Sequence, residues 1–94
     1  MITKQEAFEI AKKYVVARGR SYTKFVSVDD IFYEEQKRVG YGKYEDKKRN
    51  IFTVTYYTEG YIEDHPNFVE VDALTGEVLF TIFSQGYVEA RENF

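Results

Sequence analysis

The spacing of apolar residues changes once along the chain, at Gly19, and this change limits the fold more than any other feature. Before Gly19, apolar residues recur at intervals of three and four, the pattern of a helix that buries one side. This stripe consists of Ala7, Ile10, Ala11, Tyr14 and Val15. After Gly19, the apolar runs are short and rich in Val, Ile, Phe, Tyr and Thr, as β-strands are. The sequence therefore predicts an α+β domain: one N-terminal helix packed on a single antiparallel sheet of about four strands.

The limits of the helix can be read from its ends. Thr3 is followed three residues later by Glu6, a capping box in which each side chain accepts a hydrogen bond from the other residue's amide. Gly19 follows the last apolar residue of the stripe and suits a left-handed cap. The small Ala7 and Ala11 would let the helix axis approach a sheet closely.

The strands are expected at about residues 24–36, 50–58, 68–72 and 77–83, with 86–90 as a candidate extension of the sheet. Asp29 and Asp30 interrupt the first run, so we expect a bulge or a break into two short strands there. A helix over residues 28–36 is the alternative interpretation. In the second run, strict alternation assigns Phe52, Val54 and Tyr56 to one face and Thr53, Thr55 and Tyr57 to the other.

The segment VDALTGEVLF, residues 71–80, predicts a tight hairpin between the last two main strands. Asp72 can accept hydrogen bonds from amides two or three residues ahead, and Thr75 can do so more weakly. Gly76 tolerates the positive φ that a bulged return requires. Each polar residue in this segment thus has a role in the turn.

Length and composition restrict the chain to one domain, residues 1–94, that is not stabilised by disulfides or by a thiolate metal site. A chain of 94 residues supports a single core. With no Cys, disulfides, thiolate metal sites and thiol nucleophiles are excluded. No stretch has the roughly 20 apolar residues of a membrane helix, and residues 1–10 lack the apolar region of a secretory signal. We expect a cytoplasmic protein if Met1 is the native start, and an extracytoplasmic one if a signal peptide has been removed.

Charge is distributed unevenly along the chain. Residues 37–50 contain six Lys and Arg against two acids, a net charge of +4, which leaves −7 for the rest of a chain whose total is −3. This segment is predicted to be a mobile hairpin loop. Its Tyr41 and Tyr44, set among basic residues, match a nucleic-acid stacking pattern. The acidic remainder disfavours nucleic acid and instead suits docking onto a basic protein.

Catalysis and metal binding find little support in the sequence. An acidic cluster is formed by Asp29, Asp30, Glu34 and Glu35, and the only imidazole is His65. No spacing among them matches a metal-binding loop or a pair of catalytic carboxylates. Carboxylates that face solvent and a histidine in a turn before Pro66 account for the same residues. We predict no enzyme, no cofactor and no metal.

Three segments carry a resemblance to a known family. Residues 2–15 (ITKQEAFEIAKKYV), 51–57 (IFTVTYY) and 69–79 (VEVDALTGEVL) resemble the PepSY domain. The helix-plus-hairpin layout is also similar to small bacterial immunity proteins encoded beside polymorphic toxins. The chain departs from this pattern at residues 37–50 and in its tail, GYVEARENF. The resemblance implies a module that binds another protein or a peptide and supplies no catalytic residue.

The aromatic content points to an interface. Nine Tyr and eight Phe exceed the ten or so large aromatics that we estimate, roughly, for a core of this size. Tyr57, Tyr61, Phe83, Tyr87 and Phe94 are expected to remain partly exposed because each lies on the off-face of a strand, in a loop or in the tail. The candidate partner-binding residues are Tyr57, Tyr61, Phe83, Tyr87, Tyr41 and Tyr44. Cross-strand pairing of surface tyrosines is the alternative explanation.

These observations together favour a non-enzymatic inhibitor that binds another protein. The first interpretation is an immunity protein that neutralises a bacterial toxin. The second is an extracytoplasmic PepSY-type module that inhibits or regulates a peptidase. The third is a ligand- or nucleic-acid-binding module that uses the loop at residues 37–50. The sequence makes no prediction about oligomeric state.

Overall fold

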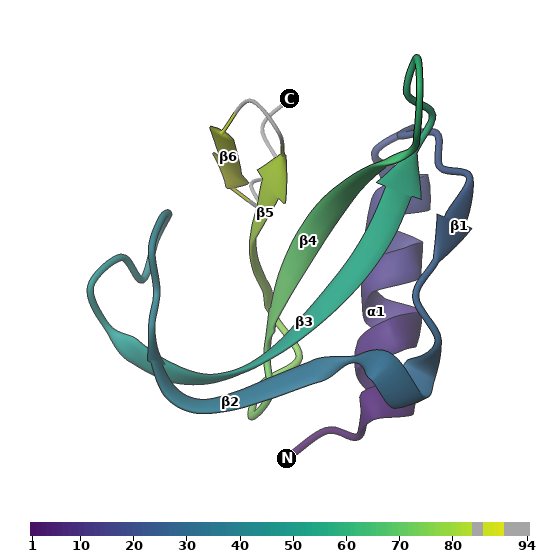
Figure 1. Ribbon diagram of the computed structural model, residues 1–94. Coiled ribbons are helices and arrows are strands. Elements are labelled where there is room, and N and C mark those ends of the chain that lie inside the picture. Colours follow the sequence, from purple (N-terminus) through teal and green to yellow (C-terminus); the bar gives the residue numbers. More distant parts are fainter. Residues whose placement is uncertain (84–85, 90–94) are drawn as a thin grey trace.

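The computed structural model describes residues 1–83 and 86–89, and in it one helix lies against one antiparallel sheet (Figure 1). The predicted α+β fold is confirmed. The elements are α1 (Lys4–Ala17), β1 (Lys24–Phe25), the 3₁₀ turn η1 (Val28–Asp30), β2 (Phe32–Arg38), β3 (Lys48–Thr58), β4 (His65–Asp72), β5 (Val78–Phe83) and β6 (Gly86–Glu89). Among the described residues, no helix is long and apolar enough to cross a membrane.

The helix α1 has the ends that the sequence predicts. The Thr3 hydroxyl accepts a hydrogen bond from the Glu6 amide at 3.1 Å, and the Glu6 carboxylate accepts one from the Thr3 amide at 2.8 Å. Beyond the C-terminus of α1, Gly19 adopts a φ of +69°. The side chains of Ala7, Ala11 and Val15 are fully buried against the sheet. The capping box and the left-handed glycine are therefore confirmed.

The strand β3 is central to the sheet. Both β1 and β2 pair with one edge of β3, at different positions along it, while β4, β5 and β6 follow in order on the other side. The sheet has more strands than expected for two reasons. The first predicted strand is interrupted by η1, where the Ser27 hydroxyl accepts a hydrogen bond from the Asp29 amide, so the expected break is confirmed. The candidate extension forms β6, although Ala90 lies outside the described residues.

The alternative of a helix over residues 28–36 is wrong. Only Val28–Asp30 are helical, and β2 begins two residues later, at Phe32. The reason is pairing: Phe32 and Tyr33 lie in register with Thr53 and Phe52 of β3. Tertiary contact with β3 thus decides the conformation of this run.

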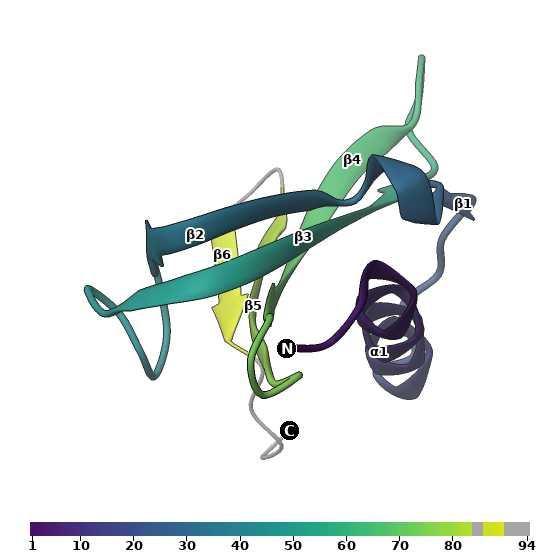
Figure 2. The ribbon, with the colours of Figure 1, turned by 90° about the horizontal axis from the view of Figure 1, so that it is seen from below.

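The two faces of the sheet differ in cover (Figure 2). On the helix side, Phe52, Val54 and Tyr56 of β3 pack with α1 and with Val69 and Val71 of β4, which confirms the alternation predicted for this run. We call the opposite side, which carries the side chains of Phe32, Thr53, Thr55, Phe68 and Glu70, the open face. Figure 1 shows β2 and β3 extending past the helix to residues 37–50, the segment of net charge +4 that we call the basic loop.

The β4–β5 hairpin closes as predicted. One carboxylate oxygen of Asp72 accepts hydrogen bonds from the amides of Leu74 at 2.8 Å and Thr75 at 3.2 Å. The Thr75 hydroxyl accepts one from the Glu77 amide at 3.1 Å, and Gly76 has a φ of +80°. The helix contacts this turn, because a side chain at Gly76 would meet the Ile10 Cδ1 atom at 3.2 Å.

The basic loop between β2 and β3 is more compact than the mobile loop that the sequence predicts. Val39 is only 1% exposed and exchanges backbone hydrogen bonds with Lys47 and Asp46. Together with Ile51, Leu79 and Phe80, Val39 forms a second small core, against which Tyr41 and Tyr44 pack. The loop folds back because burial of these apolar groups on the sheet is favourable.

The substitution Gly76→Ala should lower the free energy of unfolding by about 1–2 kcal/mol, because an alanine is strained at positive φ. Urea denaturation of the purified variant measures this. The control is Gly40→Ala, since Gly40 lacks a positive φ and an added Cβ would have no neighbour within 4 Å. A loss in Gly76→Ala no larger than in Gly40→Ala would contradict the role given to the turn.

Candidate protein-binding face

Strand register places four side chains of three chemical kinds in one row across the open face. Phe32 of β2 pairs with Thr53 of β3, Thr53 with Glu70 of β4, and Glu70 with Phe80 of β5. Residues directly paired in an antiparallel sheet have side chains on the same face. Next to this row lies a second one, formed by Thr55, Phe68 and Ile82. The open face thus combines aromatic, hydroxyl and carboxylate groups.

A buried carboxylate lies at the centre of this face. Glu70 is 1% exposed, and its two oxygens accept hydrogen bonds from the Lys37 ammonium at 3.0 Å and the Thr53 hydroxyl at 2.6 Å. A second carboxylate, that of Glu34, lies 3.3 Å from the same ammonium. A buried charge is stable only when it is paired and hydrogen-bonded, so Lys37 and Thr53 are what allow an acid at this position.

A bulge in β2 brings Lys37 to the open face. In a regular strand, Glu34 and Lys37 would point to opposite faces, because side chains alternate. The register shifts between these two residues, and Gln36 takes a φ of +52°. The side-chain oxygen of Asn50 accepts a hydrogen bond from the Gln36 amide at 3.0 Å and so holds the bulge. Glu34 and Lys37 can therefore share one face.

The surroundings of Lys37 favour its charged form. Partial burial by itself would lower the pKa of this ammonium, but its hydrogen bond to Glu70 and the negative charges of Glu70 and Glu34 outweigh burial and raise the pKa above its ordinary value. Lys37 is consequently charged at neutral pH. The ion pair across the open face is a permanent feature there.

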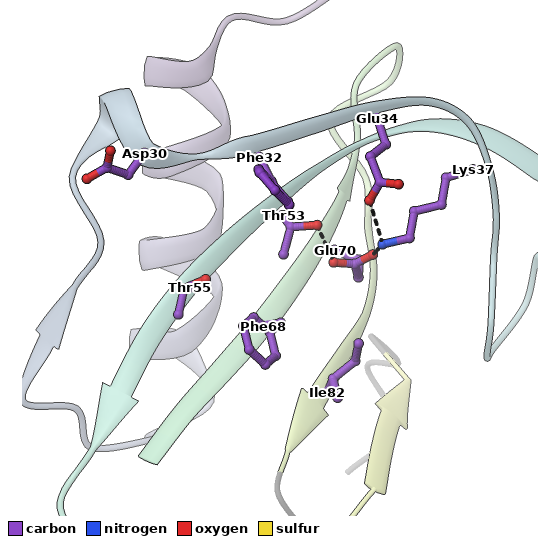
Figure 3. Close-up of a pocket in the computed structure, with 9 residues that line it drawn as sticks. All are labelled: Asp30, Phe32, Glu34, Lys37, Thr53, Thr55, Phe68, Glu70 and Ile82. Carbon is purple, nitrogen blue, oxygen red and sulfur yellow. Dashed lines mark hydrogen bonds and ion pairs between the residues drawn. The ribbon is translucent and has the colours of Figure 1, made fainter. Parts of the chain in front are cut away.

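An open pocket of about 480 Å³ lies beside this ion pair (Figure 3). It is lined by Asp30, Phe32, Glu34, Lys37, Thr53, Thr55, Phe68, Glu70 and Ile82. Phe32 is 70% exposed, which is unusual for a phenylalanine on a sheet. Within the described part of the chain, the Asp30 carboxylate makes no hydrogen bond or ion pair. The pocket therefore offers an apolar surface and an unpaired carboxylate to a partner.

A second exposed apolar feature is the loop between β3 and β4. Tyr61 is fully exposed and Ile62 is 90% exposed, and we call this pair of residues the tip. The loop is held at its base, where the Thr23 hydroxyl donates a hydrogen bond to the Asp64 carboxylate at 2.7 Å. Tyr57 lies on the same strand face as Thr53 and Thr55 and is half-buried, with the Lys24 ammonium 5.1 Å from its ring centre.

Phe83 does not lie where the sequence suggests. It packs against the core on the helix side, and the Arg20 guanidinium carbon lies 4.8 Å from the centre of its ring. The physical reason is the register of β5, in which Thr81 pairs with Val69, a helix-side residue, so Phe83 shares that side. The expected off-face position of Phe83 is therefore wrong, although its side chain remains partly exposed.

The other aromatic candidates are placed as follows. Tyr41 and Tyr44 are partly buried against the second small core, and the Tyr44 hydroxyl donates a hydrogen bond to Glu77 at 3.1 Å. They do not form the exposed stacking platform that a nucleic-acid site would need. In β6, the backbone of Tyr87 pairs with that of Ile82 in β5. Phe94 lies outside the described residues.

The acidic residues form no metal centre in the described part of the chain, where no group of three His, Asp or Glu side chains is arranged to hold an ion. Asp29 and Asp30 lie on η1, and Glu34 is engaged with Lys37. His65 begins β4 and is exposed. What the aspartates and glutamates provide is negative charge on and around the open face.

Sequence reasoning missed Glu70 and Lys37. A signal for Glu70 was present, since it is an acid at the centre of the otherwise apolar run at residues 68–71. An acid among buried strand residues requires a partner. No signal identified Lys37, because its position depends on the bulge at Gln36.

Replacing Lys37 should destabilise the protein, because the buried Glu70 carboxylate would lose its ion pair. In Lys37→Met, the Glu70 carboxylate keeps only the Thr53 hydroxyl, and the free energy of unfolding should fall by about 1–3 kcal/mol. The double variant Lys37→Met/Glu70→Gln should recover part of this loss, since a neutral amide is less costly to bury. Chemical denaturation of both proteins measures the effect. A single variant as stable as the wild type would contradict the pairing.

The difference in free energy of unfolding between the wild type and Lys37→Met should depend on pH in a defined direction. The folded-state pKa of Lys37 is raised, so the ion pair contributes its full stability below the ordinary value of 10.5 and loses it as the pH rises through the folded-state value. The stability gap between wild type and Lys37→Met should thus be constant from about pH 7 to 9 and shrink above about pH 10.5. Lys4→Met, at an exposed helix position, is the control. A gap that closes below pH 9 would be inconsistent with this pairing.

The chain was also compared with known proteins. Neither models of protein families, nor curated protein sequences, nor solved structures gave a significant match.

Proposed function

We propose that this protein is a non-enzymatic inhibitor that binds another protein through the open face and the tip. The observation that carries the proposal is the exposure of large apolar side chains beside two pockets. Phe32 is 70% exposed at the pocket of the open face, and Tyr61 and Ile62 are 101% and 90% exposed at a second pocket on the β3–β4 loop. Exposed apolar groups that gather around a concave surface are typical of interaction sites. Aromatic residues in particular supply much of the binding energy at protein interfaces.

We further propose that the partner is a toxin, for which this chain is the immunity protein. Two arguments support the proposal: the helix-plus-hairpin layout, which is similar to that of small bacterial immunity proteins, and the net charge of −7 outside residues 37–50. Opposite charge on a partner accelerates association and selects against wrong partners. Toxins that cleave nucleic acids commonly have basic surfaces, because they bind a polyanion.

The tip is suited to anchor such a partner. Its two apolar side chains project from a loop that carries Glu59, Glu63 and Asp64. The loop is tight, since a side chain at Gly60 would collide with the backbone carbonyl of Glu63. A rigid loop loses little conformational entropy on binding. The tip therefore pairs an apolar contact with an acidic rim.

The test begins with the adjacent gene. We expect it to encode a toxin domain, whose toxicity on expression in bacteria should be abolished when this chain is co-expressed. An inactive variant of that domain should form a stoichiometric complex with this chain in isothermal titration calorimetry. Undiminished toxicity together with no measurable complex would refute the immunity role.

Truncation of the tip should weaken that complex. Tyr61→Ala and Ile62→Ala should each reduce the binding free energy by more than about 1 kcal/mol without loss of thermal stability, because both side chains are exposed in the free protein. Leu74→Ala is the matched control, since Leu74 is 59% exposed but lies in the β4–β5 turn at the other end of the hairpin strands. Equal affinities in all three variants would exclude the tip from the interface.

A further inference from the structure

We propose that the pocket on the open face receives an arginine side chain from a basic partner protein. This inference rests on the proposed protein-binding function and specifies the chemistry of one contact. It is argued from the charge of the pocket, the nature of its walls and the fixed position of Lys37.

The charge of the pocket favours a cation. The described part of its lining contains three carboxylates, those of Asp30, Glu34 and Glu70, and one ammonium, that of Lys37, which gives a net charge of −2. The Lys37 ammonium is already engaged with Glu70 at 3.0 Å and Glu34 at 3.3 Å. Asp30 has no such partner among the described residues. An incoming cation would therefore find a carboxylate that residues 1–83 and 86–89 leave uncompensated.

The walls of the pocket select the kind of cation. Phe32 presents a largely exposed ring, and Phe68 and Ile82 add apolar surface from β4 and β5. A guanidinium is planar and weakly hydrated, so it stacks on an aromatic ring while its edge donates hydrogen bonds to a carboxylate. An ammonium is compact and strongly hydrated, and loses more on entering such a site. Arginine thus fits better than lysine.

The arrangement of the side chains allows both contacts at once. Figure 3 shows Asp30 at one end of the pocket, with its carboxylate directed away from Phe32, the Glu34–Lys37 pair at the other end, and Phe32 between them. Because the Asp30 side chain is exposed, its carboxylate can turn toward a guanidinium that lies against Phe32, while the apolar stem of the arginine lies toward Phe68. The Thr55 hydroxyl, which also lines the pocket, supplies an additional acceptor.

The buried ion pair keeps the pocket available. Among the described residues, Lys37 is the only basic group of the lining, and its two carboxylate partners restrain it from competing for Asp30. The Thr53 hydroxyl fixes the second oxygen of Glu70 at 2.6 Å. A site whose groups are held in place before binding loses less entropy when it is occupied. Glu70, Lys37 and Thr53 are accordingly positioning residues for the pocket.

The first experiment uses a blocked peptide, acetyl-Gly-Gly-Arg-Gly-Gly-amide, titrated into the full chain and followed by NMR chemical shifts. The matched probe replaces arginine with citrulline, which has nearly the same shape and no charge. We expect the amides of Phe32, Thr53, Thr55 and Phe68 to shift with the arginine peptide and the citrulline peptide to bind at least fivefold more weakly. Equal binding of both peptides, or shifts confined to other surfaces, would overturn the proposal.

Variants of the chain test the two contacts separately. Asp30→Asn and Phe32→Leu should each weaken the arginine peptide at least threefold. The control Asp29→Asn removes the same charge from the neighbouring position of η1, which does not line the pocket, and should change affinity less than twofold. Equal losses in Asp30→Asn and Asp29→Asn would indicate a general charge effect and refute a specific site. Circular dichroism confirms that each variant is folded.

The peptide titration does not depend on any toxin. A chain that binds the arginine peptide in the pocket but protects against no toxin would retain this inference and lose the immunity role. A chain that neutralises a toxin, with affinity unaltered by Asp30→Asn and Phe32→Leu, would lose this inference and retain the proposed function. The two failures are thus distinguishable.

Discussion

The buried carboxylate of Glu70 is the constraint on which the open face depends. An acid that is 1% exposed has to be neutralised locally, and the ammonium of Lys37 and the hydroxyl of Thr53 are the two groups that do so. These groups come from β2, β3 and β4, so the side chain of Glu70 links three strands that are already paired through their backbones. It also requires the bulge at Gln36, without which the lysine would point to the other side. The pocket then follows from the space left beside the pair.

The two sides of the sheet differ in role: the helix side supplies most of the packed core, and the open face presents charged and exposed aromatic groups. On the helix side, small and branched residues such as Ala7, Ala11 and Val54 are fully buried, and stability comes from close packing. On the open face, Phe32 is 70% exposed and lies next to charged groups, whereas Phe80 is buried in the second small core. Phe32 illustrates the contrast, since its neighbour in sequence, Ile31, is buried on the helix side while Phe32 itself is largely exposed.

Local rules predicted the fold well and the candidate site poorly. The capping box at Thr3, the turn at Asp72 and Gly76, and the alternation in β3 depend on residues close in sequence, which a single sequence displays. Lys37 and Glu70 are 33 positions apart and meet only because a bulge alters the phase of β2. Phe83 was misplaced for a related reason, since an irregularity in the pairing of β4 and β5 sets the phase of the residues after it. The face on which a strand residue lies can therefore be predicted from alternation only up to the first bulge in its strand.

The β4–β5 turn also reaches beyond the scaffold. One oxygen of Asp72 accepts the two amide hydrogen bonds of the turn, while the other lies 3.5 Å from the Arg49 side chain on β3. The Arg49 guanidinium carbon in turn lies 4.6 Å from the centre of the Tyr44 ring in the basic loop. The Asp72 carboxylate thereby makes both a local contact, with the amides of its own turn, and a long-range contact, with Arg49 of β3. The β4–β5 hairpin can close early in folding, because its contacts are local. Its Asp72 carboxylate can then bind Arg49 when β3 pairs with β4, and Arg49 in turn holds Tyr44 of the basic loop.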